Sequence, residues 1–287
     1  MTLANLKRAL AAAIAFVWVA VTLIFDLPLV PMGEKLDRSK FEEIPTFADE
    51  FDGDTMDPAK WNPNFHQYNV VFEQRGGWWH SDMVEVKDGA LRINTAYKPE
   101  GIGGGPAGFY SSGIDAQYKF EQTYGYFEAR CKLPRGGGKW AAFWLRSHGA
   151  GPVGDDIEID IMEAPNFAKT GMNHQSIVHN IHKYSNWEHQ GGKKIAKTFV
   201  KNPYDEFHTY GVEWNEKEII FYVDGVESAR RDTEGLAVKD VYPMFTVEIG
   251  GENSIPGESW VGAAIQDDEN LPSSFVVDYV RAYQYKK

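Results

Sequence analysis

Residues 155–165 carry an unusual concentration of acidic side chains in the sequence Asp-Asp-Ile-Glu-Ile-Asp-Ile-Met-Glu-Ala-Pro. On a β-strand the three isoleucines would face a core, and Glu158 and Asp160 would point together to the other side. Glu163 is out of phase with Glu158, but a β-bulge between them would return it to the same face. Because like charges side by side destabilise a strand, the cluster indicates chemistry rather than stability.

Three acids on one face suit the hydrolysis of a glycosidic bond. The reaction needs one ionised and one protonated carboxyl group, and a separation of about 5–5.5 Å between them gives retention of configuration. An acid between the two, here Asp160, would raise the pKa of one neighbour and orient the other. The spacing alone leaves two other interpretations open, which are an acidic edge strand and a calcium site.

The elements that must position these acids are short strands. Residues 125–133 alternate strictly, which places Cys131 on the core face as a small apolar residue rather than a nucleophile. Asp-Gly pairs at 88–89 and 224–225 predict hairpin turns. Many short strands at this spacing predict an all-β sandwich or jelly roll, with no second domain and no 20–50-residue repeat.

The amino terminus differs from the rest of the chain. Two basic residues precede an uncharged apolar run at residues 9–25, which predicts a hydrophobic helix and is typical of an export signal or a membrane anchor. We interpret residues 1–32 as a signal peptide or N-terminal membrane anchor, residues 33–45 as a charged linker and residues 46–287 as the globular domain. A buried amphipathic helix is disfavoured, because the run has no polar face. An extracellular or cell-surface location follows, secreted or anchored.

Composition excludes several classes of protein. The 287 residues include 41 acidic and 29 basic side chains, and the net charge of −12 argues against nucleic-acid binding. The single cysteine excludes an intramolecular disulfide framework and a multi-cysteine zinc site. Aromatic residues make up 14%, which favours a sugar-binding cleft or a β-rich core. A monomer is the default expectation.

The acidic segment resembles a known family. Residues Glu158 to Glu163 match the Glu-x-Asp-x-x-Glu signature of glycoside hydrolase family 16, in its laminarinase-type form. Further similar segments span nearly all of residues 46–287: Asp49-Glu50-Phe51, Gly125-Tyr126-Phe127-Glu128-Ala129-Arg130, Trp140-Ala141-Ala142-Phe143-Trp144-Leu145, Phe207-His208-Thr209-Tyr210, Ile220-Phe221-Tyr222-Val223-Asp224-Gly225 and Val277-Asp278-Tyr279-Val280-Arg281. The resemblance implies a concanavalin A-like β-jelly-roll sandwich with a concave substrate cleft. It implies Glu158 as nucleophile, Glu163 as general acid/base and Asp160 as the assisting acid.

Aromatic residues are the candidates for sugar contact. Trp140 and Trp144 follow the family's cleft strand, and an indole face packs well against the C–H face of a pyranose; core packing is the alternative. Trp78 and Trp79 form a second aromatic cluster in a predicted loop and are a further candidate pair.

A histidine is expected beside Glu163. The resemblance places His179 in the cleft, and we follow it. Alternation along residues 176–182 predicts the opposite, because His179 shares a phase with two isoleucines while Asn180 and His182 share the other face. An ordinary core or surface histidine is the alternative.

No cofactor is required for this chemistry. The resemblance implies a possible structural calcium ion held by Glu50, the backbone carbonyl of Gly89 and Asp278, since oxygen ligands suit calcium. Departures from the laminarinase pattern, among them Glu248 near the cleft wall, leave the catalytic set intact and leave the substrate open.

These features predict a retaining endo-β-glycanase that hydrolyses β-1,3- or mixed β-1,3-1,4-glucan. The alternatives are a transglycosylase, an agar- or carrageenan-type galactan hydrolase on the same site, and a non-catalytic glycan-binding module. A pure binding module would need neither a nucleophile nor a proton donor. A sulfated galactan would be repelled by the acidic chain unless the cleft is locally basic, for which four arginines are candidates: Arg75, Arg130, Arg135 and Arg146.

Overall fold

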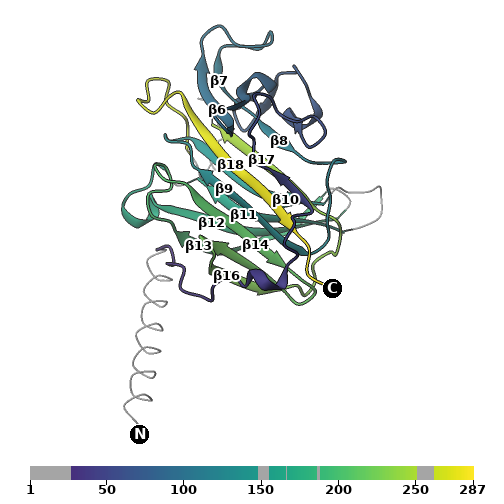
Figure 1. Ribbon diagram of the computed structural model, residues 1–287. Coiled ribbons are helices and arrows are strands. Elements are labelled where there is room, and N and C mark those ends of the chain that lie inside the picture. The colour runs from purple at the N-terminus through teal and green to yellow at the C-terminus, as the bar shows by residue number, and fades with distance from the viewer. Residues whose placement is uncertain (1–26, 148–154, 166, 186–187, 251–261) are drawn as a thin grey trace.

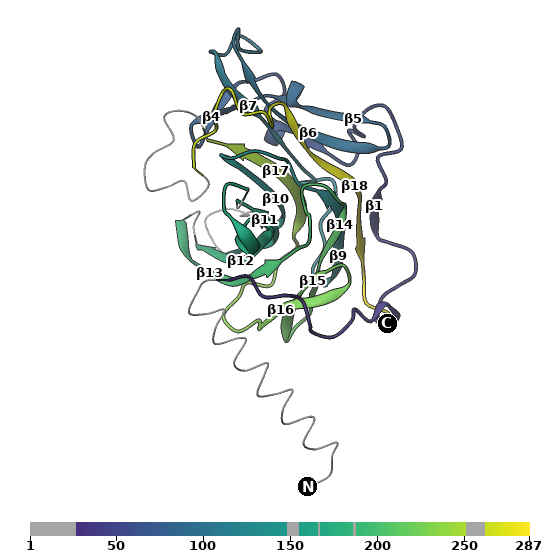
Figure 2. The same cartoon turned by 90° about the vertical axis from the view of Figure 1, so that its left-hand side faces the viewer.

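Two β-sheets pack face to face in the computed structural model (Figure 1), which describes residues 27–147, 155–165, 167–185, 188–250 and 262–287. Turned by 90°, the same view shows the two curved layers, with β17, β10, β11 and β12 in one and β18, β9 and β14 in the other (Figure 2). The prediction of an all-β sandwich is therefore confirmed. The hydrophobic helix predicted over residues 9–25 lies outside the described residues.

The first layer is a seven-stranded antiparallel sheet that contains the acidic segment. Its strands, in spatial order, are β13 (Glu188–Phe199), β12 (Ser176–Ser185), β11 (Asp155–Ala164), β10 (Lys139–Arg146), β17 (Tyr242–Ile249), β8 (Gly113–Asp115) and β2 (Asn62–Pro63).

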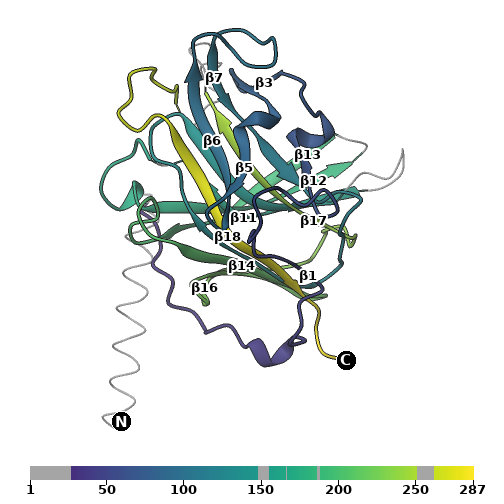
Figure 3. The same cartoon turned by 45° about the horizontal axis from the view of Figure 1, so that its top comes forward.

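The second layer is an eleven-stranded sheet. Its main path is β16 (Val226–Asp232), β15 (Glu218–Val223), β14 (His208–Trp214), β9 (Gly125–Lys132), β18 (Ser273–Tyr283), β6 (Ala90–Lys98), β7 (Gly108–Ser111), β4 (Gly77–Trp79) and β3 (Phe72–Gln74). In addition, β1 (Phe47–Asp49) pairs with β18, and β5 (Val84–Lys87) pairs with β6. Short 3₁₀ helices are η1 (Arg38–Lys40), η2 (Asn64–His66), η3 (Ser81–Met83) and η4 (Gly171–Asn173). Figure 3 shows β3 and β7 at one end of the molecule and β16 at the other.

The alternating sequences place the core between the sheets. The three isoleucines of β11 and Cys131 of β9 are fully buried there, as predicted. Phe143 and Phe245, on neighbouring strands, stack with ring centroids 4.8 Å apart. Both predicted hairpins form, and Asp88-Gly89 joins β5 to β6 with positive φ at both residues, as a tight primed turn requires.

Residues 33–45, interpreted above as a linker, lie against the eleven-stranded sheet. Phe41 is only 2% exposed and packs with the ring of Tyr126. Further upstream, the backbone of Leu29 exchanges two hydrogen bonds with β13, through Lys197 and Phe199. Within the described part of the chain, no helix has the length and apolar character needed to cross a membrane.

Candidate active site

A bulge in β11 brings the three acids into phase. Between Asp160 and Glu163 the register with both neighbouring strands shifts, because Ile161 and Met162 together take one position of the ladder. The extra residue turns Glu163 to the same face as Glu158 and Asp160, and all three side chains line one cavity. The predicted bulge is confirmed.

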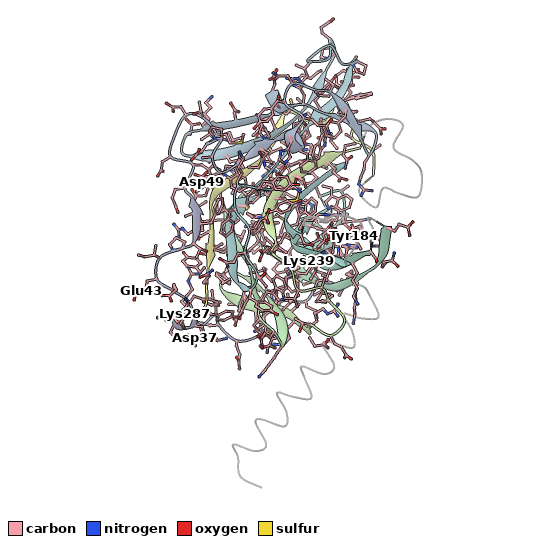
Figure 4. The ribbon with its side chains drawn as sticks, turned by 90° about the vertical axis from the view of Figure 1, so that its right-hand side faces the viewer. Asp37, Glu43, Asp49, Tyr184, Lys239 and Lys287 are labelled. Carbon is pink, nitrogen blue, oxygen red and sulfur yellow. The ribbon has the colours of Figure 1, made fainter. Side chains whose placement is uncertain are left out.

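This cavity has a volume of about 210 Å³ and lies on the outer face of the seven-stranded sheet, opposite the buried isoleucines. Its other lining residues come from β10, β17, β12, the end of β3 and the β3–β4 turn: Gln74, Arg75, Trp140, Ala142, Trp144, Arg146, Tyr184, Thr246 and Glu248. Figure 4 shows Tyr184 on the opposite side of the molecule from Asp37 and Glu43. The cavity therefore lies on the other side of the molecule from residues 37–43 (Figure 4).

Glu158 is held as an ion pair. Arg146, directly opposite on β10, donates from Nη1 to Glu158 Oε2 at 2.6 Å. The Tyr184 hydroxyl, from β12, donates to the same oxygen at 3.2 Å. The Arg146 guanidinium also lies over the Tyr184 ring, 4.2 Å from its centroid. An ionised Glu158 is therefore stabilised by a cation and a neutral donor at once.

Asp160 is buried between its two acidic neighbours. Its Oδ2 atom lies 3.3 Å from His182 Nε2 and accepts no hydrogen bond from the described residues. Burial raises the pKa of Asp160 well above its ordinary value, the charge of Glu158 adds to this, and Arg146 opposes it. The site therefore favours a protonated Asp160 beside an ionised Glu158.

Glu163 is the second acid whose environment favours the neutral form. Burial raises its pKa well above the usual glutamate range, and the nearby charge of Glu158 adds to the effect. The Asn180 side-chain amide donates to Glu163 Oε2, which opposes the rise without cancelling it. Its surroundings favour a proton donor, and the ion pair with Arg146 holds Glu158 as a candidate nucleophile, so the cavity presents both groups.

Trp140 and Trp144 both line the cavity, as predicted, and both are partly exposed. The indole nitrogen of Trp144 donates to Thr246 Oγ1 at 3.2 Å, which fixes the ring. The Arg75 guanidinium lies over the Trp140 ring, 4.7 Å from its centroid.

Glu248 stands at the Trp140 end of the cavity, paired with Trp140 across β17 and β10. It forms an ion pair with Arg75 and accepts a hydrogen bond of 3.1 Å from Gln74 Nε2. Burial raises its pKa, and the charge of Arg75 opposes the shift. The position predicted for Glu248 near the cleft wall is confirmed.

The prediction that His179 lines the cleft is wrong. His179 is fully buried between the sheets, stacks on Phe221 with centroids 4.7 Å apart, and lies 2.6 Å through Nδ1 from the carbonyl oxygen of Ile161. Burial lowers its pKa to about 4, so it is neutral near pH 7. The bulge belongs to β11, whereas β12 alternates regularly through this region, so it is Asn180 that faces the acids.

The second aromatic cluster is not brought to the cavity. Trp79 is fully buried against Phe65 and Phe72, so the prediction that it contacts sugar is wrong. Its neighbour Trp78 is partly exposed beside Gly108 and is not among the residues that line the cavity. The short strand β4 turns one indole into the core and the other away from the acids.

The predicted calcium ligands are engaged otherwise. Both oxygens of Glu50 accept hydrogen bonds from Arg281 at 2.7 and 2.8 Å. Asp278 accepts from Arg130 at 2.7 Å. A calcium ion would have to displace two guanidinium groups, so this arrangement does not fit the ion, and calcium binding stays a prediction.

Among the described residues, one group of potential metal ligands lies within 4.8 Å of one another, namely Glu158, Asp160 and His182. The Arg146 cation already occupies Glu158 Oε2, so we assign no metal to this group.

Sequence reasoning missed two contacts of the site. Asn180 and His182 share a phase on β12, and extending this alternation by two residues would have found Tyr184. Arg146 was considered only as a source of local positive charge. Its pairing with Glu158 depends on the register between β10 and β11, which alternation within one strand does not give.

A β-sandwich whose cavity holds one carboxyl group paired with a cation, and one whose burial favours the protonated form, has the kind of site that glycoside hydrolases use. The comparisons agree, because the model of the GH16 domain of beta-porphyranases A–D matches residues 41–285. The chain belongs to glycoside hydrolase family 16.

Two curated relatives are similar to the chain along most of its length. Endo-1,3-1,4-beta-glycanase EglC of Rhizobium meliloti is 31% identical over 271 residues, which cover 86% of this chain and 53% of the relative. This chain therefore spans about half the length of EglC. A beta-glucanase of Rhodothermus marinus is 27% identical over 281 residues, covering 88% of this chain and 89% of the relative.

Among solved structures, SCLam, a non-specific endo-beta-1,3(4)-glucanase of family GH16, superposes with a TM-score of 0.71 at 24% identity. The match covers 91% of this chain and 97% of SCLam. At this identity the match supports the jelly-roll fold.

Proposed function

We propose that the protein is a retaining endo-β-glycanase that hydrolyses β-1,3- or mixed β-1,3-1,4-glucan. One observation carries the proposal: the bulged strand presents two glutamates to one cavity, Glu158 paired with Arg146 and Glu163 in an environment that favours its protonated form. The two carboxyl groups therefore have the unlike surroundings that double displacement requires. Both relatives described above carry the name of a β-glucanase or β-glycanase.

In the first step, an oxygen of Glu158 attacks the anomeric carbon while the glycosidic C–O bond breaks. Glu163 gives its proton to the departing sugar oxygen and becomes a carboxylate. In the second step Glu163 takes a proton from water, the water oxygen attacks the anomeric carbon, and the ester bond to Glu158 breaks. Asp160, protonated between them, limits the repulsion that two adjacent charges would create.

A neutral glucan fits the cavity better than a sulfated galactan. Trp140 and Trp144 supply exposed indole surface for sugar rings. Arg75 and Arg146 also line the cavity, but each is paired with an acid there, so neither adds net positive charge. The other candidate cations are engaged outside the cavity, Arg130 with Asp278 and Arg135 with Asp205.

A sulfated galactan such as porphyran is the second candidate substrate. The family model that matches the chain is named for beta-porphyranases, and this observation alone favours it. Displacing Glu248 or Glu158 from its arginine would be the condition for binding a sulfate group in this cavity.

The test is release of reducing ends by the full chain from laminarin, lichenan, barley β-glucan, porphyran and agarose, with Glu158→Gln as the control. We expect products from laminarin or lichenan, first formed as the β-anomer by NMR, and none from the folded control. Release from porphyran alone would establish the second candidate. Longer glycans without new reducing ends would indicate transglycosylation. No change in any of the polymers would contradict the proposal that the protein is a hydrolase.

We also propose an extracellular or cell-surface location, with the protein secreted or membrane-anchored through residues 9–25. The apolar character of that run supports this location. Fractionation of cells that express the full chain, with and without a high-salt wash, distinguishes an integral anchor from a secreted form.

A further inference from the structure

The ion pair between Arg146 and Glu158 takes no part in either of the two reaction steps of the proposed mechanism. Arg146 and Tyr184 reach the same oxygen of Glu158 from the two strands that flank β11. The side chains of Arg146 and Glu158 are only 20% and 13% exposed, so water screens this contact weakly. The arrangement is a clamp on one carboxylate oxygen, closed by the guanidinium stacked on the phenol ring.

Other charged or titratable groups surround the clamp without replacing it. Asp160 on β11 and His182 on β12 face each other beside Glu158. Glu248, on β17, is paired with Arg75. Among the described residues, the hydrogen bonds to Glu158 come from Arg146 and Tyr184 alone.

Both donors keep their protons through the working pH range. Burial raises the pKa of Tyr184 to about 12, and the charge of Glu158 adds to this, so the hydroxyl stays a donor. For Arg146, burial lowers the pKa but the charge of Glu158 and the hydrogen bond with Tyr184 outweigh it, and the net shift is upward.

In double displacement Glu158 is the nucleophile of the first step and the leaving group of the second. When the Glu158 oxygen bonds to the anomeric carbon, the carboxylate charge disappears and Arg146 faces a neutral ester. When water attacks, the ester C–O bond breaks, its electron pair returns to Glu158, and the charge forms again against Arg146. The clamp therefore opposes formation of the glycosyl-enzyme and favours its breakdown.

We propose that Arg146 and Tyr184 are positioning residues that make Glu158 a good leaving group in the second step and so keep the glycosyl-enzyme from accumulating. This inference rests on the proposed function. A charge-assisted hydrogen bond of this kind changes an equilibrium by roughly ten- to a hundredfold, which sets the size of the effect.

The experiment measures both steps separately with a 2,4-dinitrophenyl β-glycoside of a laminari-oligosaccharide, whose leaving group needs no proton. We expect Arg146→Met to lower kcat and KM together by about ten- to a hundredfold, with kcat/KM changed less than about threefold. A burst of dinitrophenol and a glycosyl adduct in acid-quenched protein by mass spectrometry should accompany this split. Arg146→Lys should restore most of kcat.

Tyr184→Phe keeps the test open if Arg146→Met fails to fold, since it removes only a hydroxyl at a partly exposed site. This variant should lower kcat and KM together by about three- to tenfold, with kcat/KM nearly unchanged, because one neutral hydrogen bond is lost. Loss of kcat and kcat/KM in equal proportion, without burst or adduct, would overturn the inference while leaving the hydrolase intact. If the parent protein cleaves neither the aryl glycoside nor any polymer, the proposed function itself is contradicted.

Discussion

Each sheet buries acidic side chains on its outer face, but the two sets of acids differ in how many hydrogen-bond and ion-pair partners they have. On the eleven-stranded sheet, Glu213 is only 1% exposed, yet it contacts Lys40 Nζ at 3.0 Å and accepts hydrogen bonds from the Tyr222 and Tyr285 hydroxyls. On the seven-stranded sheet, Glu163 is 4% exposed and accepts from Asn180 alone among the described residues.

The same contrast separates a second pair of acids. Glu128, on β9, forms an ion pair of 2.9 Å with Arg38 and accepts from the Tyr126 hydroxyl at 3.0 Å. Asp160, on β11, is as deeply buried, and its one ion-pair contact among the described residues is with His182, whose Nε2 lies 3.3 Å from Oδ2. A buried acid with several cationic and hydroxyl partners stabilises the fold. A buried acid with few partners has a raised pKa, so it can hold a proton and donate it in a reaction.

The cations that satisfy the acids of the eleven-stranded sheet come from residues 38–41. This segment places Arg38 and Lys40 over the sheet, and Phe41 fills the space among Tyr126 and its neighbours. The segment thus stabilises one face, while the opposite face keeps its under-paired acids.

The largest expected effect follows from removing the proton donor. Glu163→Ala should lower the rate on laminarin or lichenan by about 10³-fold, because the sugar leaving group then departs without protonation. On a dinitrophenyl glycoside the first step should remain fast, and added azide should restore turnover as a β-glycosyl azide. The measurement is product analysis by mass spectrometry. Azide without effect, or loss of the fast first step, would contradict the assignment of Glu163 as the acid/base.

The next effect concerns the paired acids. Glu213→Gln should lower the free energy of unfolding by about 3 kcal/mol, because the amide group turns a donor toward the three donors that now surround the carboxylate. Urea unfolding at pH 7 measures this, and kcat of the folded variant should equal that of the parent. A stability within about 0.5 kcal/mol of the parent would show that the pairing adds nothing net to the fold.

A smaller effect is expected at the bulge. His179→Phe keeps the stacking on Phe221 but removes the partner of the Ile161 carbonyl, and should cost about 2 kcal/mol at pH 7. The pKa of His179 is about 4 in the fold and ordinary when unfolded. Its contribution is therefore complete above about pH 6.5 and is lost as pH falls through 4. Urea unfolding at pH 7 and 4.5 should show the gap between variant and parent closing; a gap of constant size would show that His179 does not titrate this way.

Much of the site could be predicted from β11 alone. The alternation of isoleucines and acids predicted which face is buried, and the odd spacing of Glu163 predicted the bulge, because both depend only on the two-residue period of a strand. The fold class followed from the same period and from turn chemistry at Asp88-Gly89. These are local properties of the chain.

The remainder depends on contacts between distant segments. The pairing of Arg146 with Glu158 depends on register, and the docking of residues 38–41 depends on acids spaced far along the chain. His179 was misplaced because a family resemblance was preferred to alternation, which gave the correct face. The prediction for Trp79 failed because a loop was expected there, whereas Trp78 and Trp79 lie in β4, where successive side chains point to opposite sides.

The smallest expected effect is a gain in the free energy of unfolding on replacing Glu163, opposite in sign to the loss expected at Glu213. It is the sharpest test of the difference between the acids of the two sheets. Burial raises the pKa of Glu163 above its unfolded value, so its favourable contribution is complete below about pH 4 and is lost as pH rises through the folded pKa. Glu163→Gln carries no charge, and its Oε1 can still accept from Asn180. We therefore expect the variant to match the parent near pH 4 and to exceed its unfolding free energy by about 1 kcal/mol at pH 8. Urea unfolding of both proteins at the two pH values, with Glu213→Gln as the matched control on the other sheet, measures this. If Glu163→Gln were as destabilising as Glu213→Gln, the contrast between the two sheets would be wrong, because a neutral side chain of the same shape should not weaken a site that disfavours the carboxylate.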